Sequence, residues 1–543
     1  MNSTELGHQM LLGDEAIALG AVHGGASLAY GYPGTPSTEI LETCLGYAKV
    51  FPRFKATWCT NEKTAYEQAL GASLAGRRVL VTMKHVGLNV AADPFMSSAL
   101  VSIHGGLVLA VADDPGMHSS QNEQDSRYFA DFAKIICLEP ADHQQAYDMT
   151  REAFVLSEKY KMPVVLRIVT RLAHSRGVVL PRSASAINSV NKAQDPQSWI
   201  LLPNNARRQW HERLTSEATL KNEIETGPHN QLSLAPGDDV LGVITTGTAR
   251  NYYLEVASEL KTPVSHLHIG AYPLPEQKIQ QLLAGVKKLV IFEEGYPYLE
   301  RLIRGVGNSS PKPISGRMSG EVPADGELNP DIVRAALGLS VQKGLSAPAS
   351  FTIPGRPPQL CPGCPHIDSY ASIKEALSAF GVSLVTADIG CYTLGAMPEY
   401  KAIESCVCMG ASIGMAKGAS EAGLQPVVAV IGDSTFFHSG MTALVDAISA
   451  NSNITVMILD NETVGMTGGQ TTILPSNGMQ TRIKDVVLGL GVNPEHVHVL
   501  HTHRTQVHVN SAIIQKEIEY QGLSVIIAVR ECIETAKRKK VTS

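Results

Sequence analysis

Polar residues that could hold a metal-bound diphosphate follow two apolar, strand-like runs in the last third of the chain. Gly432-Asp433-Ser434 ends the first run, and 25 residues later the second run ends at Asp460-Asn461. Ligands of parallel sheets bind at the carboxyl ends of the strands, and Asp and Asn supply oxygen ligands that suit Mg²⁺. Gly432 would allow close backbone approach, and the amides after it could face phosphate. Either turn alone is common, so the spacing of the two supports the prediction.

The same spacing resembles the thiamine diphosphate motif, in which GDG or GDS precedes an Asn at a similar distance. The resemblance implies that Asp433, Asn461 and the backbone carbonyl of Thr463 bind Mg²⁺, which in turn holds the diphosphate. Gly410, in the segment MGASIG, opens a helix-like run and fits a close approach to the diphosphate. Helix–strand packing would also require a glycine there.

Glu62 is the candidate activator of such a cofactor. Thiamine chemistry needs a carboxylate on N1′ of the aminopyrimidine, and this group normally comes from a separate domain. Glu62 follows Asn61 and precedes the helix-like run AYEQALGASLAG, a position from which a side chain could reach a cofactor between domains. A glutamate that only stabilises a helix N-terminus is the common alternative. Because the diphosphate motif is also present, we favour the interpretation that Glu62 activates the cofactor.

Several longer segments resemble the 2-oxoacid:ferredoxin oxidoreductases, and in particular the large, alpha subunit of the indolepyruvate branch. These segments are YPGTPSTEI (32–40), MKHVGLN (83–89), ADDPGMHSSQNEQD (112–125), CPGCPH (361–366) and MTGGQ (466–470). The resemblance extends over essentially the whole chain. It implies a pyrimidine-binding domain first, a transketolase C-terminal-like domain second and a diphosphate-binding domain last.

The resemblance also suggests residues that act on the substrate. Thr35 corresponds to the family's threonine that contacts the substrate carboxylate. Lys84 and His85 follow a strand end, where a cation or an imidazole could meet that carboxylate or assist proton transfer. A solvated Lys-His pair in a loop is the alternative. His438 lies near Asp433 in the sequence, where core packing explains it equally well.

Cys361 and Cys364 form a C-x2-C pair, which admits redox, zinc and iron–sulfur interpretations. A second C-x2-C for zinc is missing from the sequence, Cys406-x-Cys408 is a poor substitute, and the segment before Cys361 does not look like a strand. The resemblance implies that Cys361, Cys364, Cys391 and Cys532 bind one [4Fe–4S] cluster near the thiamine. The remaining cysteines are expected to be small buried hydrophobes: Cys44, Cys59, Cys137, Cys406 and Cys408.

The elements that must position these residues are short apolar strands alternating with helix-like segments, a pattern typical of parallel sheets covered by helices. We therefore predict an α/β fold with several parallel-sheet domains. The clearest strands are 79–83, 107–112, 164–169, 240–245, 289–292, 427–431, 455–459 and 525–529. The uncharged stretch 94–112 is long enough for a membrane span, but a helix, a turn and a buried strand explain it better.

Two breaks in this pattern divide the chain. Residues 1–185 form the predicted pyrimidine domain and 186–236 a linker with one helix near 207–220. Residues 237–343 form the transketolase C-terminal-like domain, which shows no obvious polar constellation. The Pro/Ser/Gly-rich segment 344–360 is a second linker, and 361–543 form the diphosphate domain with the iron–sulfur ligands.

Composition excludes several other classes of protein. The 543 residues are 44% hydrophobic and 18% charged, which is ordinary for a folded enzyme. The formal net charge of −6 gives no case for nucleic acid or an acidic membrane as a partner. The N-terminus lacks the basic and apolar regions of a signal peptide, so we expect a cytoplasmic protein.

We therefore expect a thiamine diphosphate-dependent oxidoreductase that decarboxylates an arylpyruvate and passes the acyl group to coenzyme A. Its relatives usually continue past the position of Cys532 into a ferredoxin-like domain. We expect electrons to leave to ferredoxin or another acceptor, and a small beta/gamma-type subunit to complete a homodimer of heterodimers. A non-oxidative decarboxylase or carboligase, and a non-catalytic subunit, are the alternatives.

Overall fold

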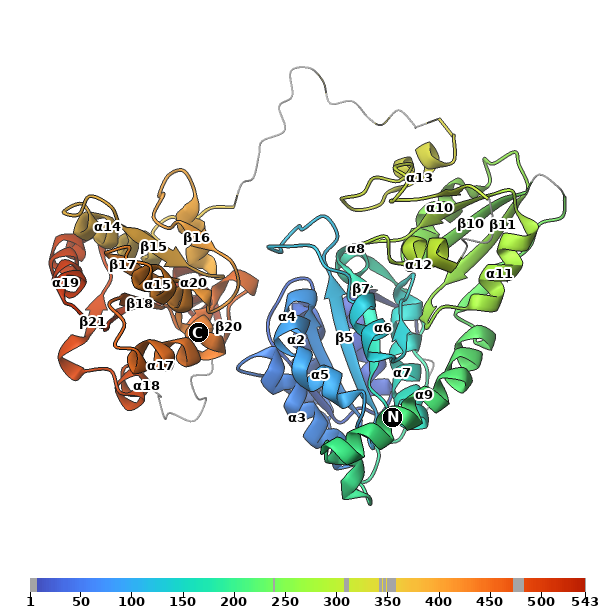
Figure 1. The fold of residues 1–543 in the computed structure, drawn as a ribbon, viewed down its shortest axis with the longest axis horizontal. Coiled ribbons are helices and arrows are strands. Elements are labelled where there is room, and N and C mark those ends of the chain that lie inside the picture. The colour runs from blue at the N-terminus through green and yellow to red at the C-terminus, as the bar shows by residue number, and fades with distance from the viewer. Residues whose placement is uncertain are drawn as a thin grey trace. The chain divides into compact units, whose positions relative to one another are not determined.

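The computed structural model describes residues 7–237, 240–306, 312–340, 344, 348, 358–471 and 483–542. They fall into two compact units, Met1–Ser346 and Ala347–Ser543 (Figure 1). The predicted α/β fold with several parallel sheets is confirmed.

The first half of unit 1 is a seven-stranded sheet of order β12-β6-β7-β5-β4-β2-β3. Its pairs are parallel except β12 with β6. The strands are β2 (Leu28–Gly31), β3 (Lys55–Trp58), β4 (Val79–Lys84), β5 (Leu107–Asp113), β6 (Cys137–Leu138), β7 (Val164–Val169) and β12 (Ala271–Tyr272). The helices are α1 (Gly13–His23), α2 (Thr38–Val50), α3 (Glu62–Leu74), α4 (His85–Val90), α5 (Ala92–Ser98), α6 (Arg127–Ala133), α7 (His143–Tyr160) and α8 (Thr170–His174). A separate antiparallel pair joins β1 (Gln9–Leu12) to β8 (Arg176–Val179).

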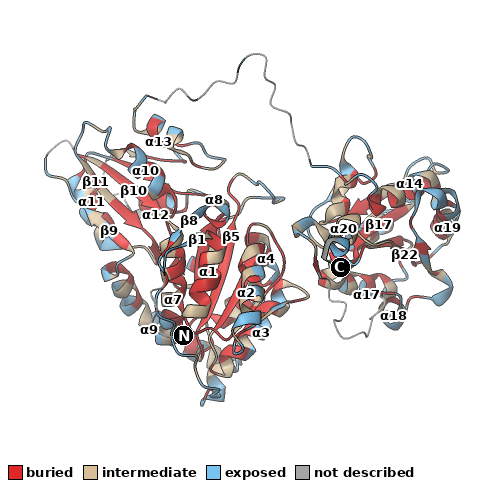
Figure 2. Ribbon diagram, turned by 180° about the vertical axis from the view of Figure 1, so that it is seen from behind, coloured by how far each residue is buried: buried red, intermediate tan, exposed pale blue. Residues whose placement is uncertain are grey.

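The central strands of this sheet are buried along their whole length, as Figure 2 shows. Every residue of β4, β5 and β7 is buried. Continuous burial requires apolar side chains on both faces of a strand, which explains the unbroken Val/Leu/Ile/Ala runs. The strands predicted at 79–83, 107–112 and 164–169 are confirmed.

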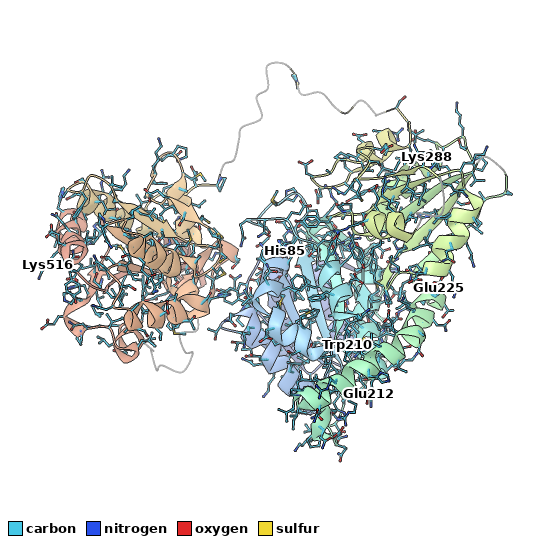
Figure 3. The ribbon with its side chains drawn as sticks, in the orientation of Figure 1. His85, Trp210, Glu212, Glu225, Lys288 and Lys516 are labelled. Atoms are coloured by element: carbon cyan, nitrogen blue, oxygen red, sulfur yellow. The ribbon has the colours of Figure 1, made fainter. Side chains whose placement is uncertain are left out.

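The second half of unit 1 has a five-stranded sheet of order β14-β13-β10-β11-β9. Its elements are β9 (Asn230–Ser233), β10 (Leu241–Thr246), α10 (Ala249–Ala257), β11 (Val264–Ile269), α11 (Glu276–Gly285), β13 (Lys288–Phe292), α12 (Tyr298–Val306), β14 (Ile314–Ser315) and α13 (Pro330–Ala336). The helix predicted near 207–220 is longer, because α9 spans Pro203–Thr226; Figure 3 labels Trp210, Glu212 and Glu225 along it.

The two sheets of unit 1 are joined by more than a linker. Strand β12 follows β11 in the chain but pairs with β6 of the first sheet. Glu225, near the end of α9, accepts hydrogen bonds from the backbone of residues 277 and 278. Whether residues 1–185 and 237–343 are separate domains stays a prediction, since both belong to one compact unit.

A buried network of ion pairs also connects these two sheets. Arg167 on β7 bonds Asp113 at 2.6 Å and Glu139 at 2.5 Å. Arg127 bonds Asp125 at 2.5 Å and reaches across to Glu293 at 3.0 Å. All these side chains are at most 3% exposed.

The network contradicts our expectation that the middle segment carries no polar constellation. Glu294 and Arg317 add a further pair from the same segment, 3.8 Å apart. The acids and arginines are scattered along the sequence, so only the packing of the two sheets brings them together.

Unit 2 contains a six-stranded, parallel sheet of order β16-β15-β17-β18-β22-β21. Its strands are β15 (Leu384–Ala387), β16 (Ser405–Cys406), β17 (Val427–Gly432), β18 (Thr455–Asp460), β21 (Val497–His501) and β22 (Ser524–Val529). Its main helices are α14 (Pro365–Leu377), α15 (Ala411–Glu421), α17 (Met441–Ser449), α18 (Ile483–Leu490), α19 (Val507–Glu519) and α20 (Ile533–Thr542). A small hairpin pairs β19 (Thr463–Val464) with β20 (Gln470–Thr471).

The apolar stretch 94–112 forms part of α5 and most of β5, as predicted. Among the described residues, no helix is long and apolar enough to cross a membrane.

Candidate functional site

Four predicted site residues of unit 1 lie at the carboxyl edge of its first sheet. Thr35 follows β2, Glu62 follows β3, and Lys84 and His85 stand at the junction of β4 and α4. The strands β3, β2 and β4 are adjacent and parallel, so their carboxyl ends lie side by side. Figure 3 labels His85 at this edge.

Glu62 begins α3, where the preceding Asn61 caps the helix by accepting a hydrogen bond from the Thr64 backbone at 2.8 Å. The Glu62 residue is only 5% exposed. Its carboxylate lies against α4, because a Cβ added to Gly87 would be 2.7 Å from Oε1 of Glu62. A carboxylate held this rigidly is oriented by its surroundings, which is a requirement for acting on one atom of a cofactor.

Lys84 is buried, and its ammonium donates a hydrogen bond to the Ser119 carbonyl at 3.2 Å. Burial lowers its pKa to about 8, against the opposing effects of Asp114 and Glu62. The Lys84 ammonium therefore loses its proton more easily than an exposed lysine does, but it is still mostly charged near neutral pH. This suits a group that binds an anionic substrate.

His85 is also buried, and Nε2 lies 3.0 Å from the Asn122 carbonyl. A neutral imidazole donates from Nε2 to that carbonyl, which leaves Nδ1 as an acceptor. Nδ1 is buried without a hydrogen-bond partner. Such a nitrogen can accept a proton or a hydrogen bond from a bound molecule.

Thr35 lies in the turn between β2 and α2 and is partly exposed. The turn is fixed by hydrogen bonds from the Gly34 amide to Thr38 and from the Ser37 hydroxyl to Gly34. Ser119 donates to the Thr35 carbonyl at 3.1 Å. The segment that contains Ser119 therefore contacts both Thr35 and Lys84.

Asp433 and Asp460 are two acidic residues at the carboxyl edge of the unit 2 sheet. Asp433 directly follows β17, and Asp460 ends the adjacent parallel strand β18. Asp433 is 4% exposed, and its Oδ2 has no hydrogen-bond partner among the described residues. Burial raises the pKa of Asp433 to about 7, and the charge of Asp460 raises it further. An unpaired buried carboxylate beside a second one is favourable for a cation, so these residues fit the predicted magnesium ion.

Asn461 and Thr463 complete this arrangement. The Asn461 side chain is held from two sides: Oδ1 accepts from the Thr463 amide at 3.1 Å, and Nδ2 faces Nε2 of His366 at 3.3 Å. Burial lowers the pKa of His366 to about 4, so its ring is neutral and can accept from Nδ2. His366 therefore orients the amide of Asn461.

The predicted glycines have packing roles in the structure. Gly410 has φ +84° at the N-terminus of α15, and a Cβ there would lie 2.8 Å from Ser439. A Cβ on Gly432 would lie 2.6 Å from the ring of Tyr392. The Ser434 amide bonds its neighbour Asp433 at 2.6 Å. Contact of Gly410, Gly432 and Ser434 with a diphosphate stays a prediction. A π-helical turn, Phe436–Gly440, follows Asp433, so the backbone is irregular next to the predicted site.

The four predicted cluster cysteines come together in unit 2. Cys361 and Cys364 precede α14, and the thiols of both, with Cys532, raise the pKa of Cys391. The main cause of that increase, to about 12, is burial. A Cβ on Gly465 would lie 3.2 Å from Sγ of Cys391 and 4.0 Å from Sγ of Cys532. Thiols with raised pKa values become thiolates when they bind a cation.

The cysteine group and the Asp433 site share backbone contacts. The Cys532 amide donates to the Asn461 carbonyl at 3.1 Å, and Asp433 also raises the pKa of Cys391. The four thiols are not close enough to one another to hold a single ion among the described residues. Ligands of an iron–sulfur cluster bind different iron atoms, so this wider spacing suits a cluster better than zinc.

The expectation for two of the remaining cysteines was wrong. Cys44, Cys59 and Cys137 are buried, as predicted, but Cys406 and Cys408 are exposed. Cys406 lies on β16, an edge strand paired only with β15, and Cys408 lies in the bend that follows this strand. Cysteine behaves as a small hydrophobe only where the fold provides a second covering layer.

The sequence reasoning missed two functional positions. Asp460 was noted only as a neighbour of Asn461, although it directly faces Asp433. Asp388, at the end of β15, accepts from the amide and hydroxyl of Ser412 at 3.1 and 2.6 Å and so anchors the start of α15. A carboxylate directly after a strand was the available signal for both.

The chain matches two family models. Residues 19–212 match "Pyruvate flavodoxin/ferredoxin oxidoreductase, thiamine diP-bdg", and residues 388–526 match "Thiamine pyrophosphate enzyme, C-terminal TPP binding domain".

Curated relatives match nearly the whole chain. A protein of Archaeoglobus fulgidus named indolepyruvate oxidoreductase subunit IorA is 36% identical over 96% of this chain and 86% of its own. The protein of that name from Methanothermobacter thermautotrophicus is also 36% identical, over 98% and 88% of the two chains. A solved 2-oxoglutarate:ferredoxin oxidoreductase of Magnetococcus marinus covers 61% of this chain and 65% of its own. Its TM-score is 0.50 at 16% identity, a likeness of fold alone.

Proposed function

The chain belongs to the family of indolepyruvate oxidoreductase IorA subunits, and from that premise we propose that it carries out the thiamine diphosphate-dependent oxidative decarboxylation of an arylpyruvate. Coenzyme A accepts the acyl group, and the electrons leave through an iron–sulfur cluster. The indolyl or other aryl preference rests on the names of the relatives.

The observation that supports this proposal best is the buried, unpaired Oδ2 of Asp433 next to Asp460. Among the described residues, no basic side chain neutralises these two carboxylates. In the proposal, Asp433, Asn461 and the Thr463 carbonyl hold Mg²⁺, and His366 keeps the amide of Asn461 correctly turned. Thiamine diphosphate, when bound, supplies the electron sink for the loss of CO₂.

Glu62, Lys84 and His85 have distinct proposed roles. The rigid carboxylate of Glu62 holds a proton at N1′ of the aminopyrimidine, which favours the reactive tautomer of the cofactor. Lys84 and Thr35 bind the carboxylate of the substrate. His85, whose Nδ1 is unpaired, accepts or returns a proton during the reaction.

Cys361, Cys364, Cys391 and Cys532 bind one [4Fe–4S] cluster in this proposal. Four thiolates are the usual ligand set of such a cluster, and cluster potentials span the range needed for one-electron steps. The hydrogen bond between the Cys532 amide and the Asn461 carbonyl ties the cluster ligand to the cofactor site. Relatives are named as subunits, so we propose a small beta/gamma-type partner subunit and an external acceptor such as ferredoxin.

A single experiment tests the proposal. Anaerobically prepared protein, with its partner subunit, is incubated with indolepyruvate, coenzyme A, Mg²⁺ and thiamine diphosphate, and a one-electron dye reports the electrons. We expect dye reduction that depends on coenzyme A, and about four iron atoms per chain. Cys532→Ser should lower iron and dye reduction while thiamine binding persists, and the exposed Cys408→Ser should change none of them. Aldehyde formation by iron-free protein would instead support a non-oxidative decarboxylase.

A further inference from the structure

A second group of ionisable side chains lies where three segments of unit 1 meet. Asp14 is near the start of α1, Glu39 lies in the first turn of α2, and His174 ends α8. One ligand atom from each side chain lies within 4.8 Å of the other two. Within the described part of the chain, no other three His, Cys, Asp or Glu side chains come this close.

Asp14 lacks the partners that a buried carboxylate normally has. The residue is 0% exposed, and neither of its side-chain oxygens has a hydrogen-bond partner in the part of the chain that the structure describes. Burial raises the pKa of Asp14 well above its usual value, and the charges of Glu39 and Glu15 raise it further. An unpaired buried carboxylate is costly unless a proton or a cation neutralises it.

His174 makes the group accessible and suits it to a metal. Nε2 of His174 is 3.4 Å from Oε2 of Glu39, and about a third of each of these two side chains is exposed. A hydrogen bond with the backbone of Pro36 is one of the causes that raise the pKa of His174, after the larger effect of Glu39. Histidines that bind metals usually use their other ring nitrogen in this way. Solvent can therefore supply an ion through the Glu39 and His174 side of the group.

We propose that Asp14, Glu39 and His174 bind one divalent transition-metal cation, of which Zn²⁺ is the representative. Two carboxylates and an imidazole select such ions over Mg²⁺ and Ca²⁺, because imidazole nitrogen is a poor ligand for the harder cations. The ion supplies the positive charge that Asp14 lacks.

The site has a structural consequence for the neighbouring turn. Glu39 follows the turn of Thr35 directly in α2, and His174 contacts the backbone of Pro36. A metal ion bound to both Glu39 and His174 would hold that turn in place. The ion would also join α1 and α2 to α8, which follows them in the sequence by more than a hundred residues.

The competing state is a protonated Asp14 beside a Glu39–His174 ion pair, and Asp14→Asn separates the two. Asparagine has the shape of a protonated aspartic acid, so this variant should fold in either case. It cannot supply the negative charge that a metal ligand provides.

In the experiment, full-length protein is stripped with a chelator, loaded with ZnCl₂, desalted and analysed for zinc. We expect wild type to retain about one zinc per chain more than Asp14→Asn or His174→Gln. Zinc should also raise the Tm of wild type by about 5 °C and leave the Tm of both variants unchanged. Subtracting the zinc content of a variant from that of wild type removes the zinc that is bound elsewhere, for example by the unit 2 cysteines.

Two matched variants serve as controls. Asp148→Asn removes a carboxylate that is paired with Arg182 at 2.6 Å, and His229→Gln removes a histidine that is paired with Glu152 at 2.8 Å. Both should bind as much zinc as wild type. Equal zinc in wild type, Asp14→Asn and His174→Gln, with equal Tm values, would overturn the proposal and identify Asp14 as a protonated acid.

Discussion

The ion-pair network of unit 1 and the Asp433 site of unit 2 both bury acidic side chains, but they neutralise them in different ways. In unit 1, Asp113 and Glu139 are bonded by Arg167, and Asp125 is bonded by Arg127. Burial alone would raise the pKa of Asp125, yet the two arginines outweigh it and hold that pKa below its usual value. The chain thus supplies its own cations there.

In unit 2, burial raises the pKa values of both Asp433 and Asp460, and an acid adds to each increase: Asp460 for Asp433, and Glu462 for Asp460. None of the causes of these shifts is a basic side chain. The difference teaches that burial of charge by itself does not mark a functional site. A site is indicated where buried charge is left for an external group to neutralise.

The largest effect is expected from removing the internal cation of unit 1. Arg167→Met leaves Asp113 and Glu139 buried without their guanidinium, and should destabilise the unit by about 3–5 kcal/mol. Denaturant unfolding measures this. Arg182→Met, which breaks an exposed pair with Asp148, should cost less than about 1 kcal/mol. Equal costs would mean that the buried network does not stabilise unit 1.

The counterpart in unit 2 is Asp433→Ala. Losing a charged metal ligand should weaken Mg²⁺-dependent thiamine diphosphate binding about 1,000-fold, or about 4 kcal/mol, with little change in folding stability. Calorimetric titration gives the affinity. Asp446→Ala, an exposed carboxylate on α17, is the control in the same unit. If Asp433→Ala bound thiamine diphosphate as tightly as wild type, this edge of the sheet would not be the cofactor site.

Glu62→Gln tests whether a buried acid of unit 1 is also functional. The neutral amide cannot hold a proton at N1′, so kcat should fall about 100- to 1,000-fold while thiamine diphosphate affinity stays within about twofold. Glu67→Gln on the exposed face of the same helix, where Glu67 pairs with Lys63, should leave kcat unchanged. If Glu62→Gln kept wild-type turnover, Glu62 would be only a carboxylate at the end of a helix, with no role in catalysis.

The same chemical change should have opposite signs in the two units. Asp125→Asn removes a charge that two arginines stabilise, so it should destabilise the protein. Asp460→Asn removes a charge whose pKa the fold raises, so it should stabilise the cofactor-free protein by on the order of 1 kcal/mol. Thermal unfolding without cofactor compares them. A loss of stability in both would contradict the contrast drawn between the units.

The smallest effect is a pH dependence. The Lys84 ammonium is present below its pKa of about 8 and is lost above it, so binding of the substrate carboxylate should weaken as the pH rises. We expect kcat/KM to fall about 10-fold between pH 7 and 9. Lys84→Arg should move this decline to higher pH, because arginine stays charged. A decline at the same pH in Lys84→Arg would assign it to another group.

Local patterns in the sequence determined the strands and the position of most site residues. Short runs rich in apolar residues predicted β4, β5, β7, β17, β18 and β22. Because parallel strands end at one edge, the residues that follow them, such as Glu62, Lys84, Asp433 and Asn461, were correctly expected at strand ends. These features depend on near neighbours in the chain, which a single sequence displays.

Tertiary structure alone decided which of these polar groups are paired. The bond between Arg127 and Glu293 joins the two sheets of unit 1, and the contact of His366 with Asn461 joins α14 to the end of β18. Tertiary structure likewise exposed Cys406 on an edge strand and Cys408 just after it, and it left Asp14 without a hydrogen-bond partner among the described residues. The physical reason is that periodicity reports the environment of one element, whereas the neutralisation of a charge depends on what distant elements bring to it.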